Sequence, residues 1–585
     1  MPGSHDTPHM KLIAFLAAVA AAMLVFRPTP PIVTMANQLV AVAGWGLVLM
    51  AVPVPTSRGA VLRAAWPLLA VFALAGTGCA IAIAGGMTPA SQGTCVLGVL
   101  LLAAVTAVHG VGAGASDAAG LSRAMAIALL VGGVCAAGIA IAQILAPGGI
   151  DGGLIAQPNT VGRASGNIGQ SNQFADTLIW GLIALVPLAD GRLRGRTGAR
   201  LAHAGWCAAA LLMLLGVVLT ASRTGLVSLG LLAVWGLLDR SLARTVRGAL
   251  AAAPAIAAIM VWAVGAWADR HGVVLMPVVR DKGGATAFRA EIWSQALTLI
   301  EAQPWLGVGW DGFGFAWSLT PFGSRGSGLV DNAHDLPLQL AVELGVPAAL
   351  AMTGLLLAAL WRAWRGVRRL PGAAGVGARS MLMIVFVVGL HSLLEFPLWF
   401  THLLFPTAWA FGFALGSAAT GGVAPAATNR VDGVRTARSW RAFGALMIVL
   451  ALSTWMDYLN VVPTFQPLDD AQTLEERIQR ARASVLFSYE GDEAAAIAFR
   501  PTPERLPVIQ AASHVLVSGP LLMAWATALN AQGQVDKARY LAARVREFTP
   551  PEAEPWFAPC TDLTVTTKPF QCLPPAVALT WRDFR

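Results

Sequence analysis

Charged side chains are scarce in this sequence. Only 12% of its 585 residues are charged, whereas soluble domains carry about 25%, so a water-soluble globule is excluded. Short segments of alternating polarity, which are typical of transmembrane β-strands, are also missing. The sequence contains no Walker loop, no H-E-x-x-H motif and no G-x-S-x-G motif. It therefore shows none of these nucleotide-binding, metalloprotease or hydrolase signatures.

Long apolar runs are abundant instead. Hydrophobic residues make up 56% of the chain, and the mean hydropathy is +0.64. Runs of roughly 17 to 25 apolar residues, the length that crosses a bilayer as a helix, recur along the sequence. The sequence predicts an all-α polytopic membrane protein with about thirteen transmembrane helices. These begin near Met10, Asn37, Ala65, Thr94, Met125, Asp176, His203, Gly225, Ala251, Leu336, Ser380, Thr401 and Ala442.

The distribution of basic residues predicts the orientation of these helices. Sixteen arginines lie in four alternate loops, around Arg192, Arg240, Arg362–Arg379 and Arg430–Arg441. Cytoplasmic loops carry such an excess of positive charge, so we expect these four loops inside the cell. An odd number of spans then places the N-terminus inside and the tail from residue 457 outside.

The same orientation divides the chain into five segments. We expect N-terminal helices, a core that contains the outer loop 148–174, a long outer loop of roughly 67 residues, C-terminal helices and a small helical tail domain. A long loop within a compact structure is usually functional. The segments are 1–147, 148–268, 269–335, 336–456 and 457–585.

Two of these segments have further recognisable features. In the long loop, Phe288–Ala302 has helical spacing with Trp293, Ala296, Leu297 and Ile300 on one side, which predicts an amphipathic helix on or near the membrane surface. In the tail, Leu521–Phe548 is typical of one helical hairpin. The tail also contains Cys560 and Cys572, which would form a disulfide in an oxidising compartment and remain free thiols in a cytosol.

Two arginines on the predicted outer face are candidates for binding an anion. Arg223 follows Ser222 at the outer end of a span, and Arg289 lies in the predicted loop helix next to Glu291. A planar guanidinium binds two phosphate oxygens at once, so the pair is suited to a pyrophosphate. Simpler readings are open: Arg223 as an interfacial arginine, and Arg289 as a solvated charge.

His334 is the candidate general base. It lies between Asn332 and Asp335, where the long loop meets the next membrane helix. An imidazole titrates near neutral pH and can take a proton from a hydroxyl. A buried or helix-capping histidine is the alternative.

A second polar group lies nearer the C-terminus. His391 and Glu395 are four residues apart, so they share one face of a helix. They form either a further wall of the site or a buried pair that joins two helices. A metal site made by His391, Glu395 and His402 is disfavoured because no compact ligand spacing is present.

The motif Gly307-Val-Gly309-Trp-Asp-Gly312 matches G-x-G-x-x-G. A dinucleotide site requires this motif between a strand and a helix, whereas here it follows Pro304-Trp305 in an outer loop. We interpret it as turns that allow the backbone to approach another segment closely.

Three stretches give the chain a family resemblance. They resemble the O-antigen ligase and polymerase superfamily, and most closely the bacterial protein O-oligosaccharyltransferases of the PglL type, the pilin glycosylation ligases. The resemblance covers most of the chain from about Ile150. The stretches are Gly166–Asp176, the loop from Pro304–Trp310 through Asn332-Ala333-His334 to Glu343-Leu344-Gly345, and His391–Trp399.

The resemblance implies a GT-C-type glycosyltransferase of the bacterial inner membrane. Such an enzyme would transfer a glycan from undecaprenyl pyrophosphate to Ser or Thr hydroxyls of pilin or another periplasmic protein, on the periplasmic face, with inversion and without a metal or other cofactor. By position, His334, Arg223 and Arg289 match the family's essential residues. Asn167, Gln170, Asn172, His391 and Glu395 are expected to bind substrate.

Three other functions are open. An O-antigen ligase would use the same site with lipid A–core as acceptor, and a Wzy-type polymerase would extend a lipid-linked glycan. The tail domain and the Gly166–Asp176 stretch favour a protein acceptor. A transporter or flippase would show internal repeats and polar residues at the bilayer midplane, but here the polar candidates gather at one face.

Overall fold

A computed structural model describes most of the chain. It covers residues 8–55, 57–149, 153–193, 199–275, 284–323, 325, 329–421, 430–467, 471–499, 501–514, 517–548 and 551–585. Within these residues the regular structure is helical, apart from one isolated bridge between Thr160 and Arg163.

The predicted spans correspond to the helices that the structure contains. Within the described ranges, nine helices are long and apolar enough to cross a membrane, and four apolar helices are shorter. The protein is therefore an all-α polytopic membrane protein, as predicted. The nine are α4 (Arg58–Ala84), α5 (Ala90–Ser116), α6 (Ala118–Leu145), α7 (Ser171–Leu193), α10 (Arg244–His271), α14 (Val346–Val367), α15 (Gly372–His391), α16 (Thr401–Thr420) and α17 (Arg430–Tyr458). The first of the four shorter helices is continuous through α1 (Pro8–Phe15), η1 (Leu16–Ala21) and α2 (Ala22–Leu24). The other three are α3 (Met35–Ala51), α8 (Ala199–Leu219) and α9 (Arg223–Leu238).

One predicted span begins too early. The tenth was expected near Leu336, but the chain forms a separate short helix, α13 (Leu336–Leu344), before α14 begins at Val346. Gly345 separates them, with φ of +82°. A Cβ at Gly345 would lie 2.2 Å from the carbonyl oxygen of Trp305. The break therefore depends on glycine, which tolerates both positive φ and this close approach.

The chain forms two compact units, each built from several stretches of sequence. The first unit comprises Met1–Ala70, Leu101–Lys282 and Leu355–Trp455, and the second comprises Val71–Leu100, Gly283–Gly354 and Met456–Arg585. Most of the long loop and the tail domain, which were predicted as separate segments, therefore belong to the same unit.

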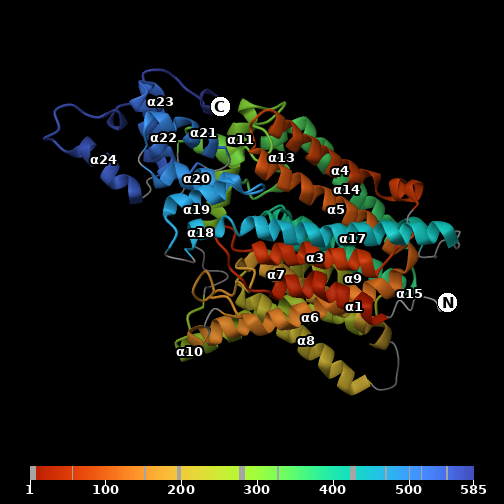
Figure 1. The fold of residues 1–585 in the computed structure, drawn as a ribbon. Coiled ribbons are helices and arrows are strands. Elements are labelled where there is room, and N and C mark those ends of the chain that lie inside the picture. Colours follow the sequence, from red (N-terminus) through yellow and green to blue (C-terminus); the bar gives the residue numbers. More distant parts are fainter. Residues whose placement is uncertain are drawn as a thin grey trace. The chain divides into compact units, whose positions relative to one another are not determined.

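In the first unit, α7 is the most enclosed of the spans. Of its apolar window Ser171–Asp190, 94% is buried, because α6, α8, α9 and α15 all pack against it (Figure 1). Glycine allows the closest of these contacts, since a Cβ at Gly133 of α6 would lie 3.0 Å from the Cα of Gly181. The beginning of α7 is thus surrounded by protein, which allows polar side chains there to be satisfied.

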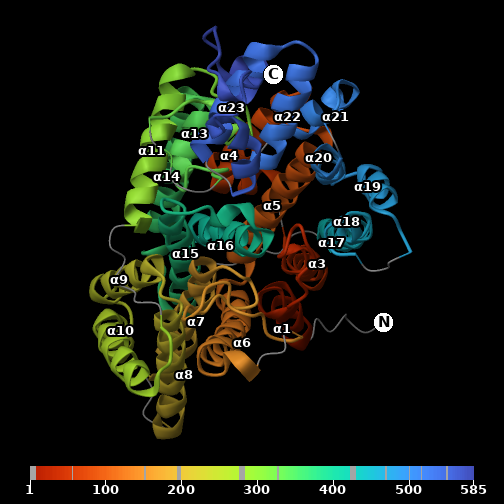
Figure 2. The same cartoon turned by 90° about the vertical axis from the view of Figure 1, so that its left-hand side faces the viewer.

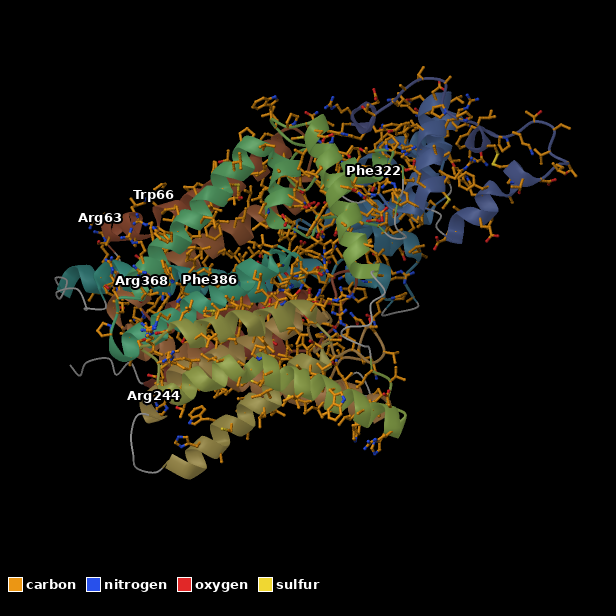
Figure 3. The ribbon with its side chains drawn as sticks, turned by 180° about the vertical axis from the view of Figure 1, so that it is seen from behind. Arg63, Trp66, Arg244, Phe322, Arg368 and Phe386 are labelled. Atoms are coloured by element: carbon orange, nitrogen blue, oxygen red, sulfur yellow. A yellow bond between two sulfur atoms is a disulfide. The ribbon has the colours of Figure 1, made fainter. Side chains whose placement is uncertain are left out.

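Basic side chains gather at one end of the first unit's helices. Figure 3 shows Arg63, Arg244 and Arg368 at the same end, although they come from three different stretches of sequence. Arg379 lies in the same group of bases and pairs with Asp239 at 2.7 Å. This grouping agrees with the alternation of basic loops along the chain.

The second unit has a core of its own. Helices α11 (Gly284–Ala302) and α12 (Phe313–Leu319) share this core with the tail helices α20 (Ser488–Ala498), α21 (Leu506–Ala512), α22 (Gly519–Ala531) and α23 (Val535–Phe548). Figure 2 shows these tail helices grouped together. Helices α22 and α23 form the predicted hairpin, with Gly533 at φ +80° in the turn.

The prediction of which residues form the apolar face of α11 is wrong in one respect. Leu297 was expected on the buried side, but 51% of it is exposed, whereas Ile292, Ala296 and Leu299 are buried. Tail residues supply the apolar partner for this face. The helix therefore buries this face in a protein core rather than against the membrane surface, a partner that local periodicity does not reveal.

Candidate functional site

The N-termini of α7 and α9 form the first polar group, in the first unit. Helix α9 begins after Ser222, whose side chain accepts a hydrogen bond from the Gly225 amide at 3.1 Å. Ala221, directly before this cap, has a φ of +48°. The Ser222 hydroxyl also donates to Asn172 in the first turn of α7, at 2.8 Å. Two helix N-termini, each with partial positive charge, therefore lie side by side, an arrangement suited to an anion.

Asn172 connects four elements at this point. Its side-chain oxygen accepts hydrogen bonds from Ser222 and from the guanidinium of Arg163, the latter at 3.0 Å. Its nitrogen donates to the Glu395 carboxylate at 3.0 Å. Asn172 and Glu395 are each only 8% exposed. This network fixes α7, α9, the outer loop and the turn after α15 to one another.

Two arginines belong to this group. Arg163 also donates to the Thr220 carbonyl at 2.9 Å, so it bridges the outer loop and the end of α8. Arg223 is the first residue of α9 and is half-buried. A positive side chain at a helix N-terminus opposes the helix dipole by about 0.3–1 kcal/mol. Helix stability therefore does not explain the position of Arg223.

Arg163 is a polar-site residue that the sequence reasoning missed. The sequence contains only a weak indication that Arg163 belongs to the site. It is a basic residue in the predicted outer loop, three residues before the Gly166–Asp176 stretch. Nothing in its immediate neighbours distinguishes it from a solvated surface charge. Only the fold brings it to Asn172 and Thr220.

Two predicted substrate-binding residues have local structural contacts. The Asn167 side chain accepts from the Ala156 amide at 3.0 Å and donates to the carbonyls of Leu24 and Leu154. Both of its N–H donors are thus used to shape the loop. Gln170 accepts from the Gln173 amide at 2.7 Å and so caps the start of α7. These two residues organise the loop that carries Arg163.

His391 is in a helix–helix contact rather than at a surface. It is fully buried, and its Nδ1 lies 2.5 Å from the Oδ2 of Asp176, which is also buried. Because Asp176 is in α7 and His391 ends α15, this contact joins two helices. It corresponds to the second interpretation of His391, a buried contact between helices. Glu395 follows in the next turn, where its amide donates to the His391 carbonyl. Of the predicted pair, Glu395 rather than His391 enters the Asn172 network.

The His334 loop is the second polar group, in the second unit. His334 has a φ of +51°, a left-handed conformation that costs about 1–2 kcal/mol for a residue with a Cβ. Hydrogen bonds hold this conformation: the His334 amide donates to the Asn332 side chain at 3.0 Å, and the Ala333 amide donates to Gln339 at 2.6 Å. Asp335 caps α13 by accepting from the Leu338 amide. Such strain persists only where the surroundings impose it, and it is common at functional sites.

Helix α11 brings Arg289 to the same part of the second unit. The ring of Phe288 contacts that of His334 edge-on, with centroids 6.4 Å apart. The Trp293 indole donates to the Ala333 carbonyl at 3.1 Å. Arg289 is four residues before Trp293 and so lies on the same helix face, one turn away. The structure thus places Arg289 and His334 in one neighbourhood of this unit.

A buried acid pair lies below the His334 loop. Gln339, which holds Ala333, also donates to Glu343 at 2.8 Å. Burial and the charge of Asp311 raise the pKa of Glu343 well above its ordinary value. Burial and the charge of Asp331 likewise raise the pKa of Asp311, which accepts from Gln92 at 2.5 Å.

The glycine motif forms the close turns that the sequence predicted. The amides of Val308 and Gly309 donate to the carbonyls of Val342 and Glu343, at 2.8 and 2.9 Å. Gly307 has φ +67°, and a Cβ there would lie 2.4 Å from the Glu343 carbonyl carbon. The motif therefore packs the loop directly onto α13.

The remaining predicted features involve cysteine and histidine side chains. Cys560 and Cys572 are joined by a disulfide. His402 is buried near the start of α16, and the described ranges contain no cluster of three or more His, Cys, Asp or Glu side chains that could hold a metal.

Comparison with known proteins finds two family models and a characterised relative. Residues 208–353 match the O-antigen ligase model, and residues 380–559 match the C-terminal model of the virulence factor membrane-bound polymerases. A general O-oligosaccharyltransferase from Acinetobacter baylyi is 26% identical over 220 residues, which cover 34% of this chain and 35% of that protein. These two regions of the chain are similar to proteins of the O-antigen ligase superfamily. The match spans about a third of the curated relative.

These matches confirm the predicted resemblance and support the prediction of a glycosyltransferase. The O-antigen ligase match includes Arg223, Arg289 and His334, and the polymerase match includes His391 and Glu395. Within the Asn172 network, Asn172 and Arg163 themselves lie before both matched regions, whereas Ser222 and Glu395 lie inside them.

Proposed function

We propose that this protein transfers an oligosaccharide from undecaprenyl pyrophosphate to Ser or Thr hydroxyls of an exported protein, such as a pilin. The observation that carries this proposal is the polar group at the paired N-termini of α7 and α9, in a chain related to a general O-oligosaccharyltransferase. A pyrophosphate is the leaving group of such a donor, and this polar group has the positive charge of two arginines and two helix N-termini to bind one.

The first unit supplies the proposed contacts to the departing pyrophosphate. Negative charge grows on the phosphate oxygen as the bond between the sugar and that oxygen breaks. Arg163, Arg223 and the two helix N-termini are positioned before reaction, so they stabilise this charge without reorganising. Glu395 acts through Asn172, which orients Arg163. Glu395 is therefore proposed as a positioning residue.

His334 is the proposed base. The acceptor oxygen forms the new bond to the anomeric carbon from the face opposite the leaving phosphate, so the reaction inverts that carbon. The acceptor proton passes to the His334 imidazole, and the electron pair of the broken bond stays on the lipid pyrophosphate. Arg289, next to His334, adds positive charge for the anionic substrate. These roles balance protons and electrons without a redox partner.

We further propose that the chain lies in the bacterial inner membrane with the reaction on the periplasmic face. The clustered bases of Arg63, Arg244 and Arg368 support a cytoplasmic position for that end of the first unit. The tail disulfide supports an oxidising compartment for the tail.

A polymerase is the second candidate function. The match of residues 380–559 to the C-terminal model of the membrane-bound polymerases favours it. In that case the acceptor is a second lipid-linked glycan. An O-antigen ligase, with lipid A–core as acceptor, is the remaining enzyme of this class.

Transfer by the purified protein tests the proposal and separates these candidates. The full chain is given lipid-linked oligosaccharide together with a candidate acceptor protein, lipid A–core or no added acceptor, each with and without EDTA. We expect glycosylated protein with and without EDTA. Product only on lipid A–core identifies a ligase, longer lipid-linked glycan identifies a polymerase, and no covalent product in any arm contradicts glycosyl transfer.

A further inference from the structure

A cavity lies within the second unit. Its volume is about 560 Å³. The glycine turn Gly307–Trp310 forms one wall, α4 and α14 form the sides, and Gln303, Arg582 and Arg585 form a polar end. The reaction described above uses none of these side chains.

Two membrane-spanning helices form part of the walls of this cavity. Leu74, Gly78 and Ile81 belong to α4, and Ala348 and Met352 belong to α14. Gly78 leaves space at this point, since a Cβ there would lie 2.7 Å from the Leu344 side chain. The cavity is thus lined mainly by groups that favour hydrocarbon over water.

The cavity edge is open to an apolar environment. Ile81 and Leu306 line it while 60% and 82% exposed, and neighbouring Trp305 is 75% exposed. Large apolar side chains so exposed mark a membrane or protein contact. Because Ile81 lies in a span, lipid is the medium that surrounds it.

The polar end carries two positive charges. The guanidinium of Arg585 lies 4.9 Å from the centroid of the Trp581 ring, and that of Arg582 lies 5.6 Å from the same centroid. Arg582 also donates to the Ala302 carbonyl at 3.0 Å. No carboxylate pairs with either arginine in the described part of the chain. Burial lowers the pKa of Arg585 to about 10, so it stays charged at neutral pH.

We propose that this cavity binds an anionic phospholipid of the membrane, with one acyl chain between α4 and α14 and the phosphate at Arg582 and Arg585. The apolar walls match the chain, and the two guanidiniums match a phosphate. The volume falls within the range of about 300–1,000 Å³ that holds a drug-sized ligand, which accommodates one acyl chain but not a whole polyprenyl chain. The occupant is therefore a resident lipid rather than the glycan donor.

The headgroup contact is tested by lipid retention. The full chain is reconstituted in nanodiscs of phosphatidylglycerol or phosphatidylcholine, extracted into detergent, and analysed by native mass spectrometry for bound lipid. We expect wild type to retain phosphatidylglycerol at least fivefold over phosphatidylcholine, and Arg582→Gln with Arg585→Gln to remove this preference. Arg482→Gln, in the same unit but away from the cavity, is the matched control. Equal retention of the two lipids, or an equal loss in the control, overturns the proposal.

The chain contact is tested by filling the cavity. Ala348→Phe places a ring between α4 and α14, and Leu350→Phe adds the same side chain on the same helix at a position that is 68% exposed. We expect Ala348→Phe alone to lower lipid retention at least fivefold with an unchanged melting curve. Unchanged lipid retention in Ala348→Phe would contradict the proposal of a bound acyl chain. Loss of retention on addition of inorganic phosphate alone would contradict it as well. Because no glycan donor is present, these results are independent of transfer activity.

Discussion

The two polar groups are held in place in different ways. Around Asn172, side chains from four elements far apart in sequence bond to one another within a buried network. Around His334, a short strained loop is fixed mainly by hydrogen bonds to its own backbone amides and carbonyls. The first arrangement depends on the assembly of the helices, whereas the second is largely local. Substitutions within the Asn172 network should therefore affect folding, whereas replacing the His334 side chain should change the chemistry without unfolding the protein.

The largest effect is expected at His334. His334→Ala removes the proposed base and should lower the transfer rate by about 10²–10⁴-fold, the usual contribution of general base catalysis. His334→Gly should lose the same activity but raise stability, because glycine relieves the left-handed strain of about 1–2 kcal/mol. Transfer assays and thermal unfolding of both variants measure these effects.

The glycine variant separates chemistry from structure at His334. His271→Ala, an exposed histidine at the end of α10, is the control and should transfer normally. If His334→Gly kept wild-type activity, the imidazole would have no chemical role. If it lost stability, the strained loop would not be the feature that we describe.

The arginines of the first unit should give the next largest effects. Arg223→Ala and Arg163→Ala each remove one positive charge from the proposed phosphate site, and we expect a loss in transfer of about 10²–10³-fold, the magnitude of removing one stabilising donor. Arg223→Lys should restore only part of this loss, because an ammonium does not form the planar two-point contact. Steady-state rates against donor concentration provide the measurement.

Arg163 should differ from Arg223 in one respect. It also bonds Thr220 and Asn172, so Arg163→Ala should lower the melting temperature, whereas Arg223→Ala should not. Equal melting temperatures of the two variants would show that Arg163 has no structural role. Full activity in both variants would contradict a phosphate site at the N-termini of α7 and α9.

The Asn172 network should show coupling between its members. Asn172→Ala removes one hydrogen-bond donor from the buried Glu395 carboxylate, which costs about 1–3 kcal/mol of stability. Glu395→Gln removes the charge, so the double variant should lose less stability than the sum of the single losses. Unfolding in detergent measures the coupling, and simple additivity would show that the two side chains do not stabilise one another.

The sequence predicted the His334 group better than the Asn172 group, for a physical reason. Asn332, His334 and Asp335 are neighbours in one loop, so their association needs no knowledge of the fold. Arg163 and Glu395 meet through Asn172 only after α7, α9 and α15 have packed. The same limit explains α11, whose apolar partner is the distant tail. Apolar length predicted the apolar helices that the described residues contain, because bilayer thickness sets that signal, but it did not reveal the break between α13 and α14.

The smallest expected effect concerns the acid pair that supports the His334 loop. Burial raises the pKa of Glu343 above its value of about 4.3 in an unfolded chain. The folded protein therefore holds a proton there that the unfolded chain releases, and stability falls as the pH rises from about 5 towards the raised pKa. Glu343→Gln cannot ionise, so its melting temperature should decline less between pH 5 and pH 9 than that of wild type. Gln339→Ala is the contrasting variant, because it removes a hydrogen-bond partner of Glu343 but keeps the ionisable carboxyl. Parallel curves for wild type and Glu343→Gln would show that this carboxyl does not couple proton release to the stability of the loop.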